Sequence, residues 1–237
     1  MNPEYAKIFD LRGNLYDAAM KLAPDARRDE FENLLTANPV DVGSSVIDIP
    51  AGGGYLKRFL PGDISYFPLE ITGAFGAQDV PVVAWDEAWP PPPADHVFCV
   101  AALHHFEDHE AAIERLLDAA KPSGVIHIAD VWARSAISRF LDDFVGAHNG
   151  TGHDGHYLPH DPARLPFPDQ LLRCEILPCP WRFDTRADMV AFARLLFALS
   201  GLSDDDIYGA LDRHVGVTET MNGVALNWSL LYADYRA

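Results

Sequence analysis

The chain has 237 residues, of which 49% are hydrophobic and 22% charged, a profile typical of a folded globular protein rather than a disordered one. A formal net charge of −17 at pH 7 leaves few cations to neutralise polyphosphates, so we expect no nucleic-acid partner. The three cysteines lie in apolar stretches and are expected to be buried thiols. No apolar run approaches the ~20 residues of a membrane span, and the N-terminus lacks the pattern of a signal peptide. We therefore expect a cytoplasmic protein with no membrane partner.

The first half of the chain alternates predicted helices and strands. Apolar residues at steps of three and four predict helices over residues 3–37, interrupted at Pro24. Two further helices are predicted at residues 54–60 and 109–124, and the link 71–79 is too short and glycine-rich for a long one. Apolar β-prone segments follow the N-terminal helices at residues 45–49, 64–69, 80–84, 96–101 and 125–131. The alternation predicts an α/β fold with a mostly parallel sheet covered by helices on both faces.

The second half is less regular. A helix is predicted over residues 136–147 and a polar, Gly- and Pro-rich surface loop over 148–170. A strand over 171–183, a helical pair over 185–214 divided at Ser200, and a final strand over 223–235 complete the chain. No composition break divides it, so we expect one domain, 1–237. Its parts are N-terminal helices (1–44), a cofactor-binding core (45–134) and an acceptor-side region with a helical lid and the last strands (135–237).

A glycine-rich turn, "VIDIPAGGGYL", follows the first predicted strand. Such a turn lets the backbone approach a ligand closely and aims amide groups at phosphate, carboxylate or ribose. The dinucleotide fingerprint G-x-G-x-x-G fails, because Lys57 stands at the third position counted from Gly52 and Gly54. A phosphate-binding P-loop also fails, since no G-K-[ST] follows. A tight turn that holds nothing remains the alternative.

The turn resembles that of class I S-adenosylmethionine-dependent methyltransferases, in which a strand ends as hydrophobic-Asp-hydrophobic-Gly-x-Gly-x-Gly. Asp48 matches the acid, Gly52 and Gly54 match two glycines, and Pro50 replaces the first. Proline removes an N–H donor, so the substitution is tolerable only where that amide makes no contact with the ligand.

The segment "AALHHFED" further along the chain is similar to the small-molecule and quinone-type methyltransferases of the same family. The resemblance covers about residues 46–132. It implies a Rossmann-like seven-stranded, mostly parallel sheet whose last strand is antiparallel, plus N-terminal helices and a helical C-terminal insertion. It also implies transfer of a methyl group from S-adenosyl-L-methionine, with S-adenosyl-L-homocysteine as product.

The resemblance also assigns cofactor contacts. Glu70, about 20 residues beyond the turn, is expected to accept hydrogen bonds from the ribose hydroxyls. Asp86 is expected to meet the adenine amino group, with Trp85 beside the ring. The full expected set of cofactor-binding residues is Asp48, Pro50, Ala51, Gly52, Gly54, Glu70, Ile71, Asp86, Glu87, Ala101, Ala102 and Leu103.

Methyl transfer from a sulfonium needs no metal, and it needs a base only when the acceptor must lose a proton. His104, after the strand 96–101, is the candidate base, with His105 a weaker one. The alternative is that His104 merely packs or caps at the strand end. A second group of histidines, in the loop 148–170, lacks the spacing of a zinc site, so we expect no metal and a solvated loop that could lie over the acceptor pocket. These histidines are His148, His153, His156 and His160.

Aromatic residues outside the predicted sheet favour an apolar pocket for a small organic acceptor. They are Tyr5, Tyr16, Trp181, Phe183, Phe192, Phe197 and Trp228. In the helical pair, Met189, Phe192, Leu196 and Leu199 are expected to face this pocket or the sheet edge. The sequence leaves open the acceptor atom and whether the protein is a monomer or homodimer. Two alternatives remain: a non-catalytic cofactor-binding module or regulatory subunit, which Pro50 supports, and, less favoured, a nicotinamide oxidoreductase.

Overall fold

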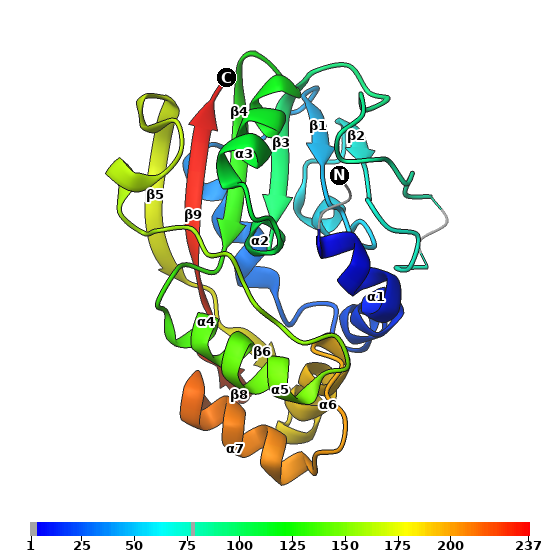
Figure 1. The fold of residues 1–237 in the computed structure, drawn as a ribbon, viewed down its shortest axis with the longest axis vertical. Helices are drawn as coiled ribbons and strands as arrows, with labels where there is room; N and C mark the ends of the chain where they lie inside the picture. Colours follow the sequence, from blue (N-terminus) through cyan, green and yellow to red (C-terminus); the bar gives the residue numbers. More distant parts are fainter. Residues whose placement is uncertain (1–3, 77–78) are drawn as a thin grey trace.

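A computed structural model describes residues 4–76 and 79–237, centred on a six-stranded sheet of order β2-β1-β3-β4-β9-β5 (Figure 1). β1 to β4 run parallel, β9 runs antiparallel to both of its neighbours, and β5 again runs with the first four. The predicted mostly parallel sheet with an antiparallel last strand is therefore confirmed. The strands are β1 (Ser45–Asp48), β2 (Ser65–Pro68), β3 (Ala94–Val100), β4 (Ala120–Asp130), β5 (Leu171–Pro178) and β9 (Ser229–Arg236).

One of the seven expected strands, residues 80–84, does not form within the part of the chain that the structure describes. Only a single parallel bridge joins Val82 to Glu70. The Glu70 N–H donates to the Pro81 carbonyl at 2.9 Å, and the Val83 N–H donates to the Glu70 carbonyl at 2.7 Å. Pro81 has no N–H to extend this ladder, so the segment stays beside the end of β2 without becoming a strand.

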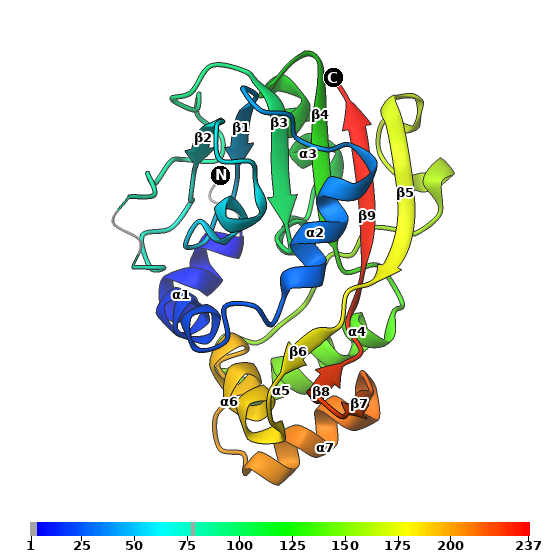
Figure 2. The same ribbon diagram turned by 180° about the vertical axis from the view of Figure 1, so that it is seen from behind.

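Helices cover both faces of the sheet. α3 (His109–Asp118) lies on one face (Figure 1) and α2 (Arg28–Ala37) on the other (Figure 2). Asp108 caps α3 by accepting a hydrogen bond from the Ala111 N–H. α3 ends before the predicted stop because Ala120 already pairs with Ala94 at the start of β4. The predicted helix at 54–60 is only a short 3-10 helix, Tyr55–Phe59.

The remaining helices gather at the carboxyl ends of β1, β3 and β4 (Figure 1). They include α1 (Glu4–Leu22), which packs against α6, and one helical stretch made of α4 (Ala136–Arg139), a π-helical segment (Phe140–Val145) and α5 (Gly146–His148). α6 (Arg186–Leu196) and α7 (Asp204–His214) are the predicted helical pair, and they lie between β5 and β9 in the chain. This helical layer therefore closes the end of the sheet at which an open α/β fold places its ligands.

The two strands predicted at 171–183 and 223–235 each divide in two. The first breaks into β5 and β6 (Trp181–Phe183) at Cys179 and Pro180, and the second into β8 (Gly223–Leu226) and β9. β6 and β8 join β7 (Val217–Thr220), which we did not predict, in a separate antiparallel sheet of order β6-β8-β7. The break in the first strand coincides with Pro180, which cannot donate to a ladder.

The core fills both sides of the sheet, and the three cysteines are free thiols, with Cys99 and Cys179 buried. Among the described residues, no helix combines the length and apolar character required to cross a membrane.

Candidate active site

Two cavities meet at the carboxyl ends of β1 and β3. Both are narrow and open to solvent, with about 460 Å³ of empty space in and around cavity 1 and about 490 Å³ in and around cavity 2. Four residues, Phe9, Tyr16, Arg27 and Ala101, line both cavities. A ligand in cavity 1 can therefore lie next to a ligand in cavity 2.

The glycine turn forms one wall of cavity 1. Asp48, Pro50, Ala51 and Gly52 line it, together with Ala101 from the end of β3. Gly52 has φ of +56°, and a Cβ built there would lie 3.0 Å from the ring of Tyr55. The turn therefore requires glycine at this position for its conformation and for the close approach of Tyr55.

Gly54 has φ of +75° and shapes the turn, but it does not line the cavity. Its N–H donates to the Ala51 carbonyl at 2.9 Å. The sequence thus placed Gly54 correctly in the turn, while its expected contact with a cofactor stays a prediction.

Asp48 is a buried acid without a cationic partner among the described residues. Its Oδ2 accepts a hydrogen bond from the Tyr66 hydroxyl at 2.6 Å. Burial raises the pKa of Asp48 to about 7, against the lowering effect of the Tyr66 hydrogen bond. A positively charged group entering cavity 1 would favour the ionised carboxylate.

Glu70 lies behind the turn, 1% exposed, and does not line either cavity. Its Oε2 accepts hydrogen bonds from the Gly52 N–H at 2.7 Å and the Tyr5 hydroxyl at 3.2 Å. Its Oε1 accepts from the N–H groups of Ile71 and Thr72. Burial raises the pKa of Glu70 to about 8, although these hydrogen bonds act in the opposite direction. Glu70 therefore already accepts four hydrogen bonds, of which the one from the Tyr5 hydroxyl is the one from a side chain.

The other expected cofactor residues lie outside the two cavities. Ile71, Ala102 and Leu103 are buried in the core. Asp86 and Glu87 are exposed. Asp86 lies on a separate wide groove with Trp85, His105 and Phe106 among its lining residues. Because His105 lines both this groove and cavity 2, the groove reaches the same end of the sheet.

His104 follows β3 and lines cavity 2. Its ring Nδ1 lies 2.6 Å from Oδ1 of Asp130, the last residue of β4. Its backbone N–H donates to Oδ2 of the same carboxylate at 3.2 Å. Burial alone would raise the pKa of Asp130, but the charge and hydrogen bonds of His104 and the Val131 N–H hold that pKa below its usual value. The pairing fixes the orientation of the imidazole. Asp130 contacts the ring at Nδ1 and not at the second ring nitrogen, Nε2.

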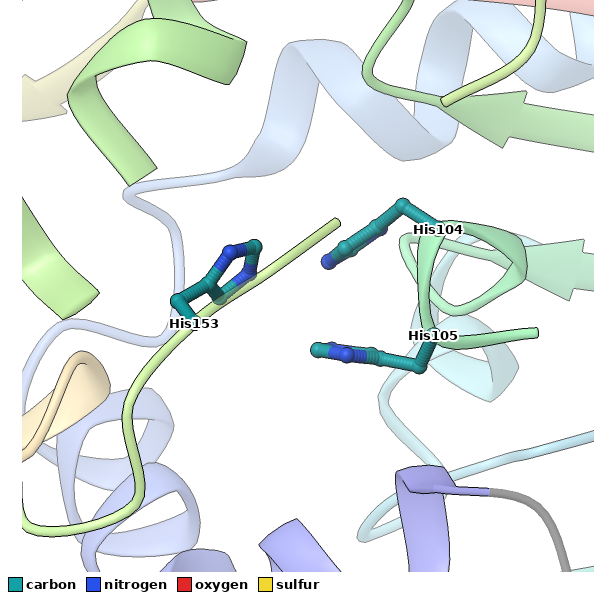
Figure 3. A group of neighbouring side chains, drawn as sticks. All are labelled: His104, His105 and His153. Carbon is teal, nitrogen blue, oxygen red and sulfur yellow. The ribbon is translucent and has the colours of Figure 1, made fainter. Parts of the chain in front are cut away.

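Three histidines converge at cavity 2, as Figure 3 shows. One ring nitrogen from each of His104, His105 and His153 lies within 4.8 Å of the others. Burial, followed by the charges of its neighbours, lowers the pKa of His105 well below its usual value, which favours the neutral imidazole. The group has the residue types of a metal site, whereas the sequence predicted none in this region.

The loop 148–170 is irregular as predicted, but part of it turns inward. The side chain of His153 is only 3% exposed, and its Nδ1 lies 2.9 Å from Oδ1 of Asp142. Asp142 also accepts a hydrogen bond from the Tyr157 hydroxyl at 2.7 Å. The His156 N–H donates to the His104 carbonyl at 2.8 Å. The expectation of a solvated loop is therefore wrong for His153, because Asp142 holds the loop over cavity 2.

Two buried arginines in the cavity walls were not predicted as site residues. Arg12 on α1 lines cavity 2, and Arg27 lines both cavities. Arg12 lies three and four residues from Phe9, Ile8 and Tyr16, on the stripe of α1 that faces the interior. A cation on an apolar stripe was the sequence signal that could have identified it.

Part of the aromatic set lines the cavities. Tyr5 and Tyr16 line cavity 1, while Trp181, Phe197 and Trp228 line cavity 2 with Tyr16. Phe183 and Phe192 pack in the core instead. The four apolar positions of the helical pair are all buried: Met189, Phe192, Leu196 and Leu199. Of these four, Leu196 lines cavity 2.

A scan against models of known protein families finds no match for this chain, and neither does a search of curated proteins. Solved structures do match. A methyltransferase of Haloferax volcanii, in complex with the Trm112 methyltransferase activator, shares 18% identity at a TM-score of 0.63, over 97% of this chain and 96% of its own. An S-adenosylmethionine-dependent methyltransferase of Thermotoga maritima shares 11% identity at a TM-score of 0.61, over 98% of this chain and 99% of its own.

A third similar structure contains ligands. It is a phosphoethanolamine N-methyltransferase of Haemonchus contortus in complex with phosphomonomethylethanolamine and S-adenosylhomocysteine, with 13% identity and a TM-score of 0.62. The match covers 98% of this chain and 59% of that one. At these identities the similarity concerns the fold: the chain has the Rossmann-like fold of class I S-adenosylmethionine-dependent methyltransferases.

Proposed function

We propose that the protein binds S-adenosylmethionine with its methionine part in cavity 1 and transfers its methyl group to a small organic acceptor in cavity 2. The observation that carries this proposal is the junction of the two cavities at Ala101, with the glycine turn on one side and an aromatic pocket on the other. The shared fold with S-adenosylmethionine-dependent methyltransferases supports the same assignment.

Two features of cavity 1 suit the methionine part of such a cofactor. Gly52 keeps one wall free of a side chain, so a ligand can approach the backbone of the turn closely. Asp48 would receive a cationic part of the cofactor, since its buried carboxyl has no other cation to pair with in the described structure. When bound, the cofactor supplies an electrophilic methyl group on a sulfonium.

We assign the ribose to Glu70 and the adenine to the groove that contains Asp86. The first assignment requires the Tyr5 hydroxyl to leave Glu70. The second is supported by Trp85 and Phe106, which lie in the wall of the groove with their ring centroids 4.5 Å apart and provide apolar contacts.

His104 is the group in cavity 2 that we propose removes a proton from a hydroxyl or amine acceptor. Asp130 holds Nδ1, so the proton from the acceptor would pass to Nε2. The negative charge of Asp130 stabilises the imidazolium that forms. Asp130 ends β4, and His104 lies in a short 3-10 helix, Leu103–His105, that follows β3.

The proposal is tested by incubating the protein with S-adenosylmethionine and a panel of hydroxylated and amino aromatic compounds, and by measuring release of S-adenosylhomocysteine. We expect at least one acceptor to raise the release above the acceptor-free rate, with His104→Gln returning it to that rate. Cofactor binding without turnover across the panel would favour a non-catalytic binding module, and tight NADH binding would favour an oxidoreductase. Either result contradicts methyl transfer.

A further inference from the structure

The two buried arginines of the site differ in their partners. Arg27 places Nε and Nη2 at 2.8 and 2.6 Å from Oε2 of Glu30, so its charge is neutralised inside the protein. Burial would lower the pKa of Arg27, but the Glu30 carboxylate outweighs burial and raises it. Arg27 is thus a complete ion pair.

Arg12 has no such partner. It is 6% exposed, and its Nη2 donates to the Leu196 carbonyl at 3.2 Å. Nε and Nη1 have no hydrogen-bond partner among the described residues, and no carboxylate there forms an ion pair with Arg12. Burial lowers the pKa of Arg12 to about 10, so the guanidinium is still charged at neutral pH. A buried cation without an anion is costly, which points to a ligand that supplies one.

The surroundings of Arg12 indicate the rest of that ligand. The guanidinium lies over Phe9, with its Cζ 5.3 Å from the ring centroid, and it lines cavity 2 opposite an aromatic and aliphatic wall. That wall includes Trp181, Phe197 and Trp228. The cavity therefore offers one unneutralised cation beside a mainly apolar wall.

We propose that the acceptor is an aromatic or other apolar carboxylate whose carboxylate group binds Arg12; this rests on the proposed function. A single carboxylate matches the single unpaired guanidinium, because Arg27 is already neutralised by Glu30. A dianionic phosphate would need a second cation, and His105 is held neutral by burial. A divalent metal at the three histidines is disfavoured by the same guanidinium, whose charge acts on His105 and His153.

The test is calorimetric titration of three acid and amide pairs into protein saturated with S-adenosylhomocysteine: benzoate and benzamide, 2-naphthoate and 2-naphthamide, and indole-3-carboxylate and its amide. Within each pair the ring is the same, and a neutral amide of similar shape replaces the carboxylate. We expect at least one acid to bind about tenfold or more tightly than its amide, with the preference lost in Arg12→Met and kept in Lys21→Met, an exposed cation on the same helix. Equal binding of acids and amides, or no binding of any acid, overturns the proposal.

Two further measurements distinguish an acceptor carboxylate from other ligands of this cavity. The carboxylate could instead be that of the cofactor, in which case Arg12→Met weakens S-adenosylhomocysteine and leaves the acid preference intact. If S-adenosylhomocysteine does not bind wild-type protein at all, the proposed function fails rather than this inference alone. Tighter binding of phenyl phosphate than of any acid, or stoichiometric Zn²⁺ binding that His153→Ala abolishes, also contradicts the assignment.

Stability provides a readout that does not depend on a chosen acid. A guanidinium kept for a ligand destabilises the empty protein, so Arg12→Met is expected to raise the melting temperature of the ligand-free form. An arginine with a purely structural role would lower it. If Arg12→Met does not fold, the acid and amide comparison on wild-type protein still decides the proposal.

Discussion

The carboxylate of Asp130 holds His104 at two points, at the imidazole Nδ1 and at the backbone N–H. Asp130 ends β4 and His104 follows β3, so neighbouring strands of the sheet bring the pair together. The carboxylate fixes both the ring orientation and the nitrogen that faces it.

Asp130→Asn is expected to lower kcat by about 10²- to 10³-fold once an acceptor is known, because general-base catalysis typically contributes this much. Asparagine can offer its amide group to Nδ1, which favours the tautomer with a proton on Nε2. Steady-state kinetics measure the effect, and S-adenosylhomocysteine affinity should change less than about threefold, well under 1 kcal/mol.

Asp142→Asn serves as the matched control, since Asp142 pairs with His153 in the same way but holds a loop. It should raise the acceptor KM more than it lowers kcat. Equal kcat losses in the two variants would remove His104 from its assigned role.

Asp48→Asn should change how stability depends on pH. The folded-state pKa of Asp48 is raised to about 7, so the contribution of Asp48 to stability is greatest below the unfolded pKa near 4 and is lost as pH rises from there through 7. Asparagine does not titrate. Between pH 4 and pH 8 the free energy of unfolding of Asp48→Asn should therefore rise relative to that of wild type, by the order of 1–4 kcal/mol. Chemical denaturation at several pH values measures the difference.

The exposed carboxylate of Asp118, at the end of α3, provides the comparison. Asp118→Asn should leave the pH dependence of the wild type intact. A constant difference between Asp48→Asn and wild type at all pH values would show that Asp48 is not a buried acid with a raised pKa.

Tyr5→Phe should tighten binding of S-adenosylhomocysteine by about 0.5–1.5 kcal/mol. The Tyr5 hydroxyl occupies an acceptor position on Glu70 that a ribose hydroxyl would need, so removing it frees that position. Glu70→Ala should weaken binding by about 1–3 kcal/mol, because it removes the acceptor altogether. Calorimetry measures both, and weaker binding in Tyr5→Phe would show that Tyr5 is not displaced.

Phe192 and Phe197 lie on α6 and directly after it, but only Phe197 lines cavity 2. Phe192→Ala should cost about 3–5 kcal/mol of stability while the acceptor KM of the folded protein stays unchanged. Phe197→Ala should raise the acceptor KM and leave cofactor affinity unaltered. If the two variants affect the acceptor KM equally, the helical pair does not form a selective wall of the pocket.

The sequence predicted the central sheet and the glycine turn because those features depend on local patterns. Apolar segments, Gly52 and Gly54, and the alternation of strand and helix are each visible within a few residues. The strand at 80–84 was predicted on the same basis from its apolar side chains. It forms only one bridge, because Pro81 has no N–H to donate to a neighbouring strand. Pro180 is a local signal for the break between β5 and β6, but the contacts of β6 and β8 with α6 join segments that no short window contains.

The candidate site was predicted only in part, for a related reason. Asp48, Gly52, Ala101 and His104 belong to a recognisable turn or strand end, and they do line the cavities. Arg12 reaches the site from a helix more than thirty residues before the turn. A long-range partner such as Leu196 cannot be inferred from spacing along the chain.

Calorimetric titration of S-adenosylhomocysteine tests the account most directly, because every assignment depends on a cofactor beside the glycine turn. We expect one molecule to bind per chain, with affinity greatly reduced in Gly52→Ala and retained in Gly62→Ala. A Cβ at Gly52 strains the backbone and meets Tyr55, whereas a Cβ at Gly62 meets open space. The account is contradicted if wild type does not bind S-adenosylhomocysteine at about 1 mM, a concentration that corresponds to a binding free energy of roughly −4 kcal/mol. It is also contradicted if both variants bind equally well.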